Sequence, residues 1–152
     1  MSGIFDEGKM MQVLGGCLPE GETLSAAVHG VTLQVNKKKS SIFDVYIGVT
    51  ERYLLVAECE ERRYLNEVYR VPDLRKTVAD DIGVCFPLAQ IQSCVIKNAL
   101  MGAVNCSLTM QDGSFLKLQL PKRGGLGGGM PHHKEYREII LARLSRLSST
   151  QT

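Results

Sequence analysis

The clearest pattern in the sequence lies near its end, where apolar residues recur every three or four positions between His132 and Leu147. This spacing predicts an amphipathic helix with one buried stripe and one charged face. The stripe consists of Tyr136, Ile139, Ile140, Leu144 and Leu147. Because a lone amphipathic helix must bury its stripe, we expect it to pack against β structure formed by the preceding chain.

Before this helix, apolar and polar residues mostly alternate, which is typical of half-buried strands. The alternation predicts seven strands, at about residues 24–35, 43–49, 53–57, 64–71, 92–98, 104–110 and 115–120. The run Tyr53–Ala57 is apolar throughout, so we expect this strand to be covered on both faces. In the first strand the phase changes at His29–Gly30, which predicts a β-bulge there and a strand that serves two sheets. Asp112–Gly113 predicts a hairpin turn.

Composition and charge limit the classes of function. The chain has 152 residues, enough for one domain, with an N-terminal helical extension at residues 1–17, a main domain at 18–148 and a tail at 149–152. A net charge of +2 gives no broad attraction to nucleic acid, and the strands lack a basic–aromatic RNA-binding pattern. We therefore expect no nucleic-acid partner.

Cysteine usage and the first residues indicate the compartment. The five cysteines include no C-x-x-C pair, and an odd number fits reduced thiols better than a disulfide framework. The first residues lack the basic start and apolar core of a secretion signal. These observations predict a cytoplasmic protein.

Three short motifs carry a resemblance to a known family. They are Val49–Leu55 (VTERYLL), Phe86–Ile91 (FPLAQI) and Gln111–Gly113 (QDG). In this order and spacing they resemble the bacterial branch of the pleckstrin-homology-like superfamily and the related GRAM domains, over residues 22–147. The resemblance implies a mainly β fold: a barrel of two near-orthogonal antiparallel sheets with about seven strands, capped by one C-terminal helix. It also implies a binding scaffold and no reaction, with homo-oligomers common among bacterial relatives.

The N-terminal segment Ile4–Leu14 is compatible with a short helix that the following glycines end. Its Met10, Met11 and Leu14 lie close together in the sequence. Two alternatives remain open for them. If they are exposed, they form a small apolar surface for self-association or a protein partner, since Met is common on adaptable binding surfaces. Otherwise the segment folds back over the open end of the barrel.

Candidate anion-binding residues are Lys37, Lys38 and Lys39, in the turn where lipid-binding relatives of this family hold a headgroup, with Arg62 and Arg63 as further candidates. Three lysines near an anionic membrane contribute about 1 kcal/mol each, which supports weak peripheral binding. The alternative is a turn whose charges simply face water.

Catalytic, cofactor and metal sites are not predicted. The glycine-rich segment 124–129 lacks the Lys and Ser or Thr that a phosphate-binding loop requires. The adjacent His132 and His133 point about 100° apart on a helix, so they cannot chelate a metal as an i,i+4 pair does. No paired acid and base can be assembled from the sequence. The sequence therefore predicts a non-catalytic interaction module, with weak binding of anionic lipid as the alternative.

Overall fold

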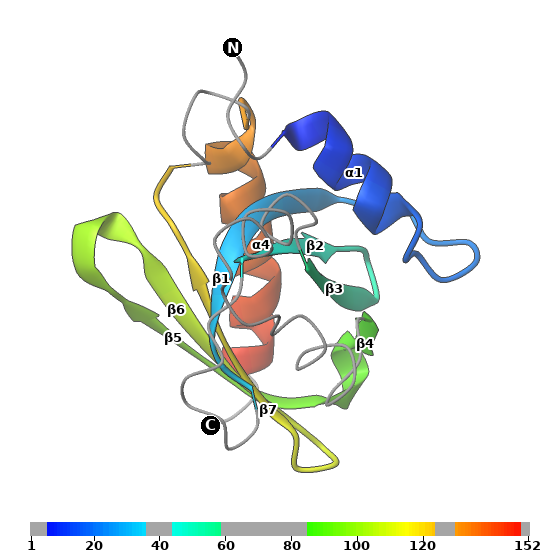
Figure 1. Ribbon diagram of the computed structural model, residues 1–152. Coiled ribbons are helices and arrows are strands. Elements are labelled where there is room, and N and C mark those ends of the chain that lie inside the picture. Colours follow the sequence, from blue (N-terminus) through cyan, green and yellow to red (C-terminus); the bar gives the residue numbers. More distant parts are fainter. Residues whose placement is uncertain (1–5, 36–43, 59–84, 124–129, 150–152) are drawn as a thin grey trace, which may run out of the picture.

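The computed structural model describes residues 6–35, 44–58, 85–123 and 130–149 (Figure 1). Its described strands are β1 (Ala26–Val35), β2 (Asp44–Val49), β3 (Tyr53–Glu58), β4 (Cys85–Pro87), β5 (Ile91–Asn98), β6 (Val104–Met110) and β7 (Phe115–Leu120). The α-helices are α1 (Glu7–Gly15) and α4 (His133–Ser149), and two 3₁₀ turns are η1 (Leu88–Gln90) and η2 (Leu100–Gly102). A mainly β fold with a helix near each end is confirmed.

The described strands form one antiparallel sheet in the order β4-β3-β2-β1-β7-β6-β5. The sheet curls around α4 like half of a barrel (Figure 1). Strand β1 makes the curl continuous, because its first part, Ala26–Val31, pairs with β2 and its last part, Val31–Val35, pairs with β7. The expected division into two near-orthogonal sheets stays a prediction.

Helix α4 fills the concave side of the sheet. Ile140 and Leu144 are fully buried, and Tyr136 and Leu147 are half-buried against the same core. The predicted stripe is therefore confirmed at these positions. Ile139 is the exception, with 38% of its surface exposed. Consecutive helical residues point about 100° apart, so the side chain of Ile139 points away from the core when that of Ile140 points into it.

Helix α1 covers the opposite, outer face of β1, β2 and β3. Its Met10 and Leu14 are fully buried, and Met11 is half-buried in the same cluster. The outward residues of the three strands are apolar and need a cover; they are Ala27, Tyr46, Leu55 and Ala57. The prediction of a free apolar surface is thus wrong for Met10 and Leu14. The segment folds back on its own chain, as the second alternative has it. It covers the outer face of the sheet instead of the open end of the barrel.

Local capping explains the bounds of α1. The Asp6 carboxylate accepts a hydrogen bond from the backbone N–H of Lys9 at 3.1 Å, which satisfies a donor that the first helical turn leaves unpaired. Gly16 follows as the C-terminal cap. In this position the helix gives β3 its second cover, so all four residues Leu54–Ala57 are buried, as the apolar run predicts.

The bulge in β1 lies later than the sequence suggests. The register with β7 shifts between Thr32 and Gln34, so the prediction of a bulge at His29–Gly30 is wrong. Gly30 serves close packing, because a Cβ there would lie 2.5 Å from Cδ1 of Ile47 and 2.9 Å from the carbonyl oxygen of Gln119. The glycine signals close approach of neighbouring strands, which is the second common reason for glycine within a strand.

The turn between β2 and β3 is held by side chains. The Thr50 hydroxyl accepts hydrogen bonds from the backbone N–H groups of Tyr53 (2.9 Å) and Arg52 (3.2 Å) and donates to Glu22 at 2.6 Å. Arg52 donates to the other oxygen of Glu22 at 2.7 Å. The Thr50 hydroxyl, followed by the Arg52 guanidinium, holds the pKa of Glu22 below its usual range. This part of the VTERYLL motif is therefore structural.

The predicted strand at residues 64–71 lies outside the described residues. Within the described part, neither helix combines the length and the apolarity that crossing a membrane requires.

Candidate functional site

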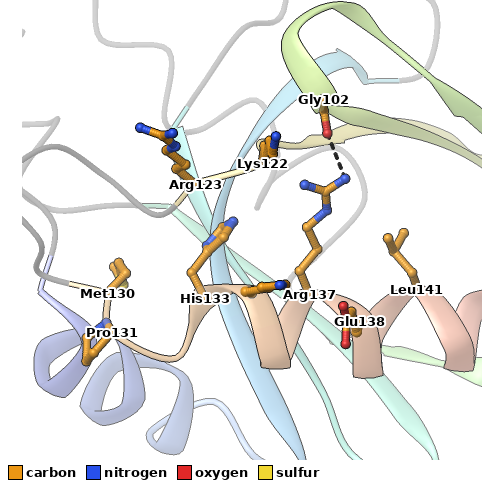
Figure 2. Close-up of a pocket in the computed structure, with 10 residues that line it drawn as sticks. Gly102, Lys122, Arg123, Met130, Pro131, His133, Arg137, Glu138 and Leu141 are labelled. Atoms are coloured by element: carbon orange, nitrogen blue, oxygen red, sulfur yellow. Dashed lines mark hydrogen bonds between the residues drawn. The ribbon is translucent and has the colours of Figure 1, made fainter.

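A cleft lies between the first half of α4, the end of β7 and the turn η2 (Figure 2). Its volume is about 630 Å³. The residues that line it are Gly102, Lys122, Arg123, Met130, Pro131, His133, Lys134, Arg137, Glu138 and Leu141. They come from three separate parts of the sequence, so the cleft exists only in the folded chain.

Arg137 builds the frame of this cleft. Its Nη2 donates to the carbonyl oxygen of Gly102 at 2.8 Å, and its Nη1 donates to that of Pro121 at 3.2 Å. The first of these bonds is drawn in Figure 2. One guanidinium therefore ties α4 both to η2 and to the end of β7. The remaining N–H groups of the same side chain keep donor capacity for a ligand.

His133 stands one helical turn before Arg137 and is 3% exposed. Figure 2 shows both side chains on the same side of α4, as the i,i+4 spacing requires. Its Nε2–H donates to the carbonyl oxygen of Pro121 at 2.7 Å, which leaves Nδ1 with the lone pair. Nδ1 is buried and has no hydrogen-bond partner in the described part of the chain. Burial, then the positive charge of Arg137, lowers the pKa of His133, so the ring is neutral at pH 7.

The charges around the cleft are strongly unequal. Lys122, Arg123, Lys134 and Arg137 carry four positive charges, and Glu138 carries one negative charge, which leaves +3 among the lining residues. The stem of Lys122 lies directly on η2, since a Cβ on Gly102 would be 2.7 Å from its Cδ. The whole chain carries only +2, so this cleft concentrates the basic character of the molecule.

Helix α1 contributes at the edge of this region. The Glu7 carboxylate accepts hydrogen bonds from the backbone N–H of His132 (3.1 Å) and from its Nδ1 (2.8 Å). The Glu7 carboxylate raises the pKa of His132. Its charge also compensates the positive end of the α4 dipole. The start of α4 is thus already capped, and the capacity of the cleft to hold an anion rests on its side chains.

The chemistry available in the cleft is that of hydrogen-bond donors and cations. Guanidinium and ammonium groups bind carboxylate and phosphate oxygens. Among the described residues, no group of three or more His, Cys, Asp or Glu side chains is placed to hold a metal ion. Burial raises the pKa of the Cys17 and Cys85 thiols, and the hydrogen bond with Cys94, followed by burial, raises that of Cys106, so none of these three is a ready thiolate nucleophile.

A second cleft lies near the other end of α4, with a volume of about 410 Å³. Arg143 and Arg146 line it, and Nη1 of Arg143 donates to the carbonyl oxygen of Thr50 at 2.6 Å and to the Ser25 hydroxyl at 3.1 Å. Because these bonds dock the helix onto the β2–β3 turn, we assign Arg143 a structural role.

The predicted anion-binding residues Lys37, Lys38, Lys39, Arg62 and Arg63 lie outside the described residues. The structure instead places other basic residues at the cleft, and these were not among the predicted anion-binding residues. Two signals pointed to them.

The first signal is the Lys122–Arg123 pair directly after the last strand. The second is the i,i+4 pair of His133 and Arg137 on the helix. Sequence alone does not show that the two pairs meet, since their contact depends on how α4 lies against the end of β7.

No family model matches this sequence, and no curated protein sequence matches it. Among solved structures, it is similar to the C-terminal domain of an unknown protein from Leishmania infantum, with 12% identity and a TM-score of 0.47; the match covers 91% of this chain and 92% of that one. It is also similar to the hSac2 domain from the human phosphoinositide phosphatase Sac2, with 12% identity and a TM-score of 0.40, over 94% of this chain and 83% of that one. Likeness at this level carries no inference about function.

Proposed function

We propose that this protein is a non-catalytic binding module that holds a phosphate-bearing anion in the cleft beside α4. The observation that carries the proposal is the convergence of four cations and one carboxylate on a single cleft. Such an excess of positive charge in a recessed site focuses the field and attracts anions over neutral ligands.

Phosphate fits the donors better than a simple halide does. Arginine presents a planar fork of N–H groups that matches two oxygens of one phosphate, and lysine adds mobile point charges. His133 adds a group that responds to protonation, because a bound anion favours the charged ring and raises its pKa. Binding therefore takes up protons, so protonation of His133 should favour the bound anion.

The pleckstrin-homology-like assignment is part of this proposal. It is supported by the position of β1, which pairs with β2 on one side and β7 on the other, and by the single closing helix. The three motifs that carry the resemblance lie at connections between strands: VTERYLL crosses the β2–β3 turn, FPLAQI leads from β4 into β5, and QDG lies in the β6–β7 turn. A cytoplasmic location is proposed on the free thiols of Cys17, Cys85, Cys94 and Cys106.

The test is titration of the isotope-labelled protein with inorganic phosphate, followed by NMR, against chloride at equal ionic strength. We expect shifts at His133 and in the first turns of α4. The variant Lys122→Glu/Arg123→Glu should weaken binding by about tenfold or more, since each lost cation near an anion contributes about 1 kcal/mol.

The matched control is Lys117→Glu/Arg146→Glu, which changes the net charge equally but away from the cleft. An equal loss of phosphate affinity in both variants would show that binding depends on net charge and not on the cleft. If the NMR signals that shift do not include those of His133, phosphate does not bind in the cleft.

Self-association is a second proposal, favoured by one observation. In the described sheet, β5 stands at the end of the strand order, and its Val95 is 47% exposed. An edge strand offers backbone groups to a second chain. Light scattering over a concentration series checks this: a defined oligomer supports edge pairing, and a monomer at all concentrations ends the proposal.

A further inference from the structure

The turn η2 between β5 and β6 presents two large apolar side chains to solvent. Leu100 is 88% exposed and Met101 is 95% exposed. Other large apolar residues with substantial exposure in the described part are Val95 and Ile139, at 47% and 38%. Tight turns are usually built from Gly, Asn, Asp and Ser. Two adjacent apolar side chains at the tip of a hairpin therefore call for an explanation.

The backbone holds these side chains outward. Met101 adopts a left-handed conformation with φ 58° and ψ 32°, which favours glycine, and Gly102 follows at φ 78°. The turn is closed by hydrogen bonds from the N–H of Ala99 to the carbonyl of Ala103 (2.8 Å) and from the N–H of Ala103 to that of Leu100 (3.2 Å). A methionine in a left-handed conformation is strained, and with 95% of its surface exposed this side chain gains little packing in return.

The tip is fixed relative to the basic cleft. The carbonyl oxygen of Gly102, next to Met101, accepts the 2.8 Å hydrogen bond from Arg137, and Gly102 itself lines the cleft. Exposed cations flank the tip: Lys97 near the end of β5, and Lys122 and Arg123 after β7. Two apolar side chains thus project beside a site with an excess of positive charge.

A bilayer fits this surface better than a protein does. A stable protein interface buries about 800 Å² on each partner, far more than two side chains supply. A membrane interface needs only a shallow apolar wedge together with cations that face anionic headgroups. The charge excess around the tip is complementary to such a surface, and Glu138 is the one carboxylate that lines the cleft.

We propose that Leu100 and Met101 insert into the interface of an anionic bilayer while the cleft beside α4 takes a lipid phosphate. This inference rests on the proposed function for the phosphate, and adds the bilayer as its source. Insertion of the tip would orient α4 and the hairpin β5–β6 toward the membrane. It would also explain why the turn keeps a methionine in a conformation that suits glycine.

The absence of Trp from the sequence allows a direct experiment. Leu100→Trp introduces a single Trp at the tip, and Gln92→Trp places one near the start of β5, about 20 Å from the end of β5 that leads into the tip. Each variant is mixed with vesicles of phosphatidylcholine, with or without phosphatidylserine, whose acyl chains are brominated to quench inserted indoles. We expect a blue shift and quenching for Trp at position 100 on the mixed vesicles only, and neither for Trp at position 92.

Three further variants separate insertion of the tip from binding of phosphate. Leu100→Ser/Met101→Ser should lower partitioning by about tenfold or more and leave titration with inorganic phosphate unchanged. Lys122→Glu/Arg123→Glu should weaken both vesicle binding and phosphate binding by about tenfold or more. A variant with Ala at positions 37–39 tests the candidate anion-binding residues named from the sequence, and binding at full strength is the expected result for it.

Each outcome has a definite meaning. Phosphate binding without vesicle binding overturns the insertion and leaves the proposed function standing. Vesicle binding without quenching at position 100 also overturns the insertion, because the headgroup contact then acts alone. If neither phosphate nor vesicles bind, both proposals fall. Loss of vesicle binding in the variant at positions 37–39 alone would assign the membrane contact to residues 37–39.

Discussion

The docking of α1 on the outer face of the sheet can be tested through Leu14. This side chain is fully buried against the strands, and Leu14→Ala removes three carbon atoms from that contact. At about 0.8 kcal/mol for each buried methylene, the transfer cost is roughly 2.4 kcal/mol, and a cavity adds to it. We therefore expect the free energy of unfolding to fall by about 2–4 kcal/mol, which lowers the Tm by about 5–12 °C.

The same contact predicts a coupling with Gly48. A Cβ added to Gly48 would lie 3.0 Å from Cδ1 of Leu14 and 2.9 Å from Cδ2 of Leu24. Gly48→Ala should therefore overpack the cluster and cost about 1–3 kcal/mol. In the double variant Leu14→Ala/Gly48→Ala, one of the two close contacts is gone. The combined loss should be smaller than the sum of the single losses, by about 1 kcal/mol.

The assay is urea denaturation followed by far-UV circular dichroism, which gives the free energy of unfolding and its dependence on denaturant. Gln12→Ala is the control within α1, because Gln12 is exposed and Ala favours the helix. If Leu14→Ala and Gln12→Ala change stability equally, α1 is not docked. Strict additivity of the two single variants would show that Leu14 does not lie on Gly48.

Three further predictions follow from single residues. Met101→Gly should relieve the left-handed strain at φ 58° and raise stability by up to about 1 kcal/mol, as a thermal melt would show; a loss of stability would contradict the strain. Ile140 is fully buried, so Ile140→Ala should lower the free energy of unfolding by about 2–5 kcal/mol. Ile139 is 38% exposed, so Ile139→Ala should lower it by less than about 1 kcal/mol. Similar shifts in Tm for the two variants would mean that α4 does not pack against the sheet as described. The Glu7–His132 contact raises the pKa of His132, so its stabilisation is complete below pH about 6.5 and is lost as pH rises through that raised pKa. In an NMR titration, Glu7→Gln should lower this pKa toward its ordinary value, and an unchanged pKa would exclude the contact in solution.

Some strands are predicted from the sequence to the residue, because local signals alone determine them. Strands β6 and β7 begin and end where the alternation does, on either side of Asp112–Gly113. In that turn Gly113 has φ 92°, and the Asp112 carboxylate accepts from the N–H of Ser114 at 2.8 Å. A glycine that tolerates positive φ and an aspartate that bonds its own backbone are what a tight turn requires.

Other features depend on contacts that no local pattern contains. The change of phase in β1 is visible in the sequence, yet the bulge lies near Thr32, where β1 pairs with β7. Whether Met10 and Leu14 are buried likewise depends on a distant surface. They are buried because the outer face of β2 and β3 is apolar and α1 covers it. The basic cleft is the extreme case, since the hydrogen bonds of Arg137 join η2, the end of β7 and the start of α4, which are far apart in the sequence.

The hydrogen bond between Glu7 and His132 has a consequence for folding during synthesis of the protein. It joins positions 125 residues apart, so it cannot form until His132 has been synthesised. A ribosome adds about 5–20 residues per second, which leaves α1 without this contact for on the order of ten seconds. Until β2 and β3 emerge, Met10 and Leu14 also lack the face that buries them. These apolar residues are therefore open to chaperones, or to other nascent chains, during a window that closes once the sheet is complete.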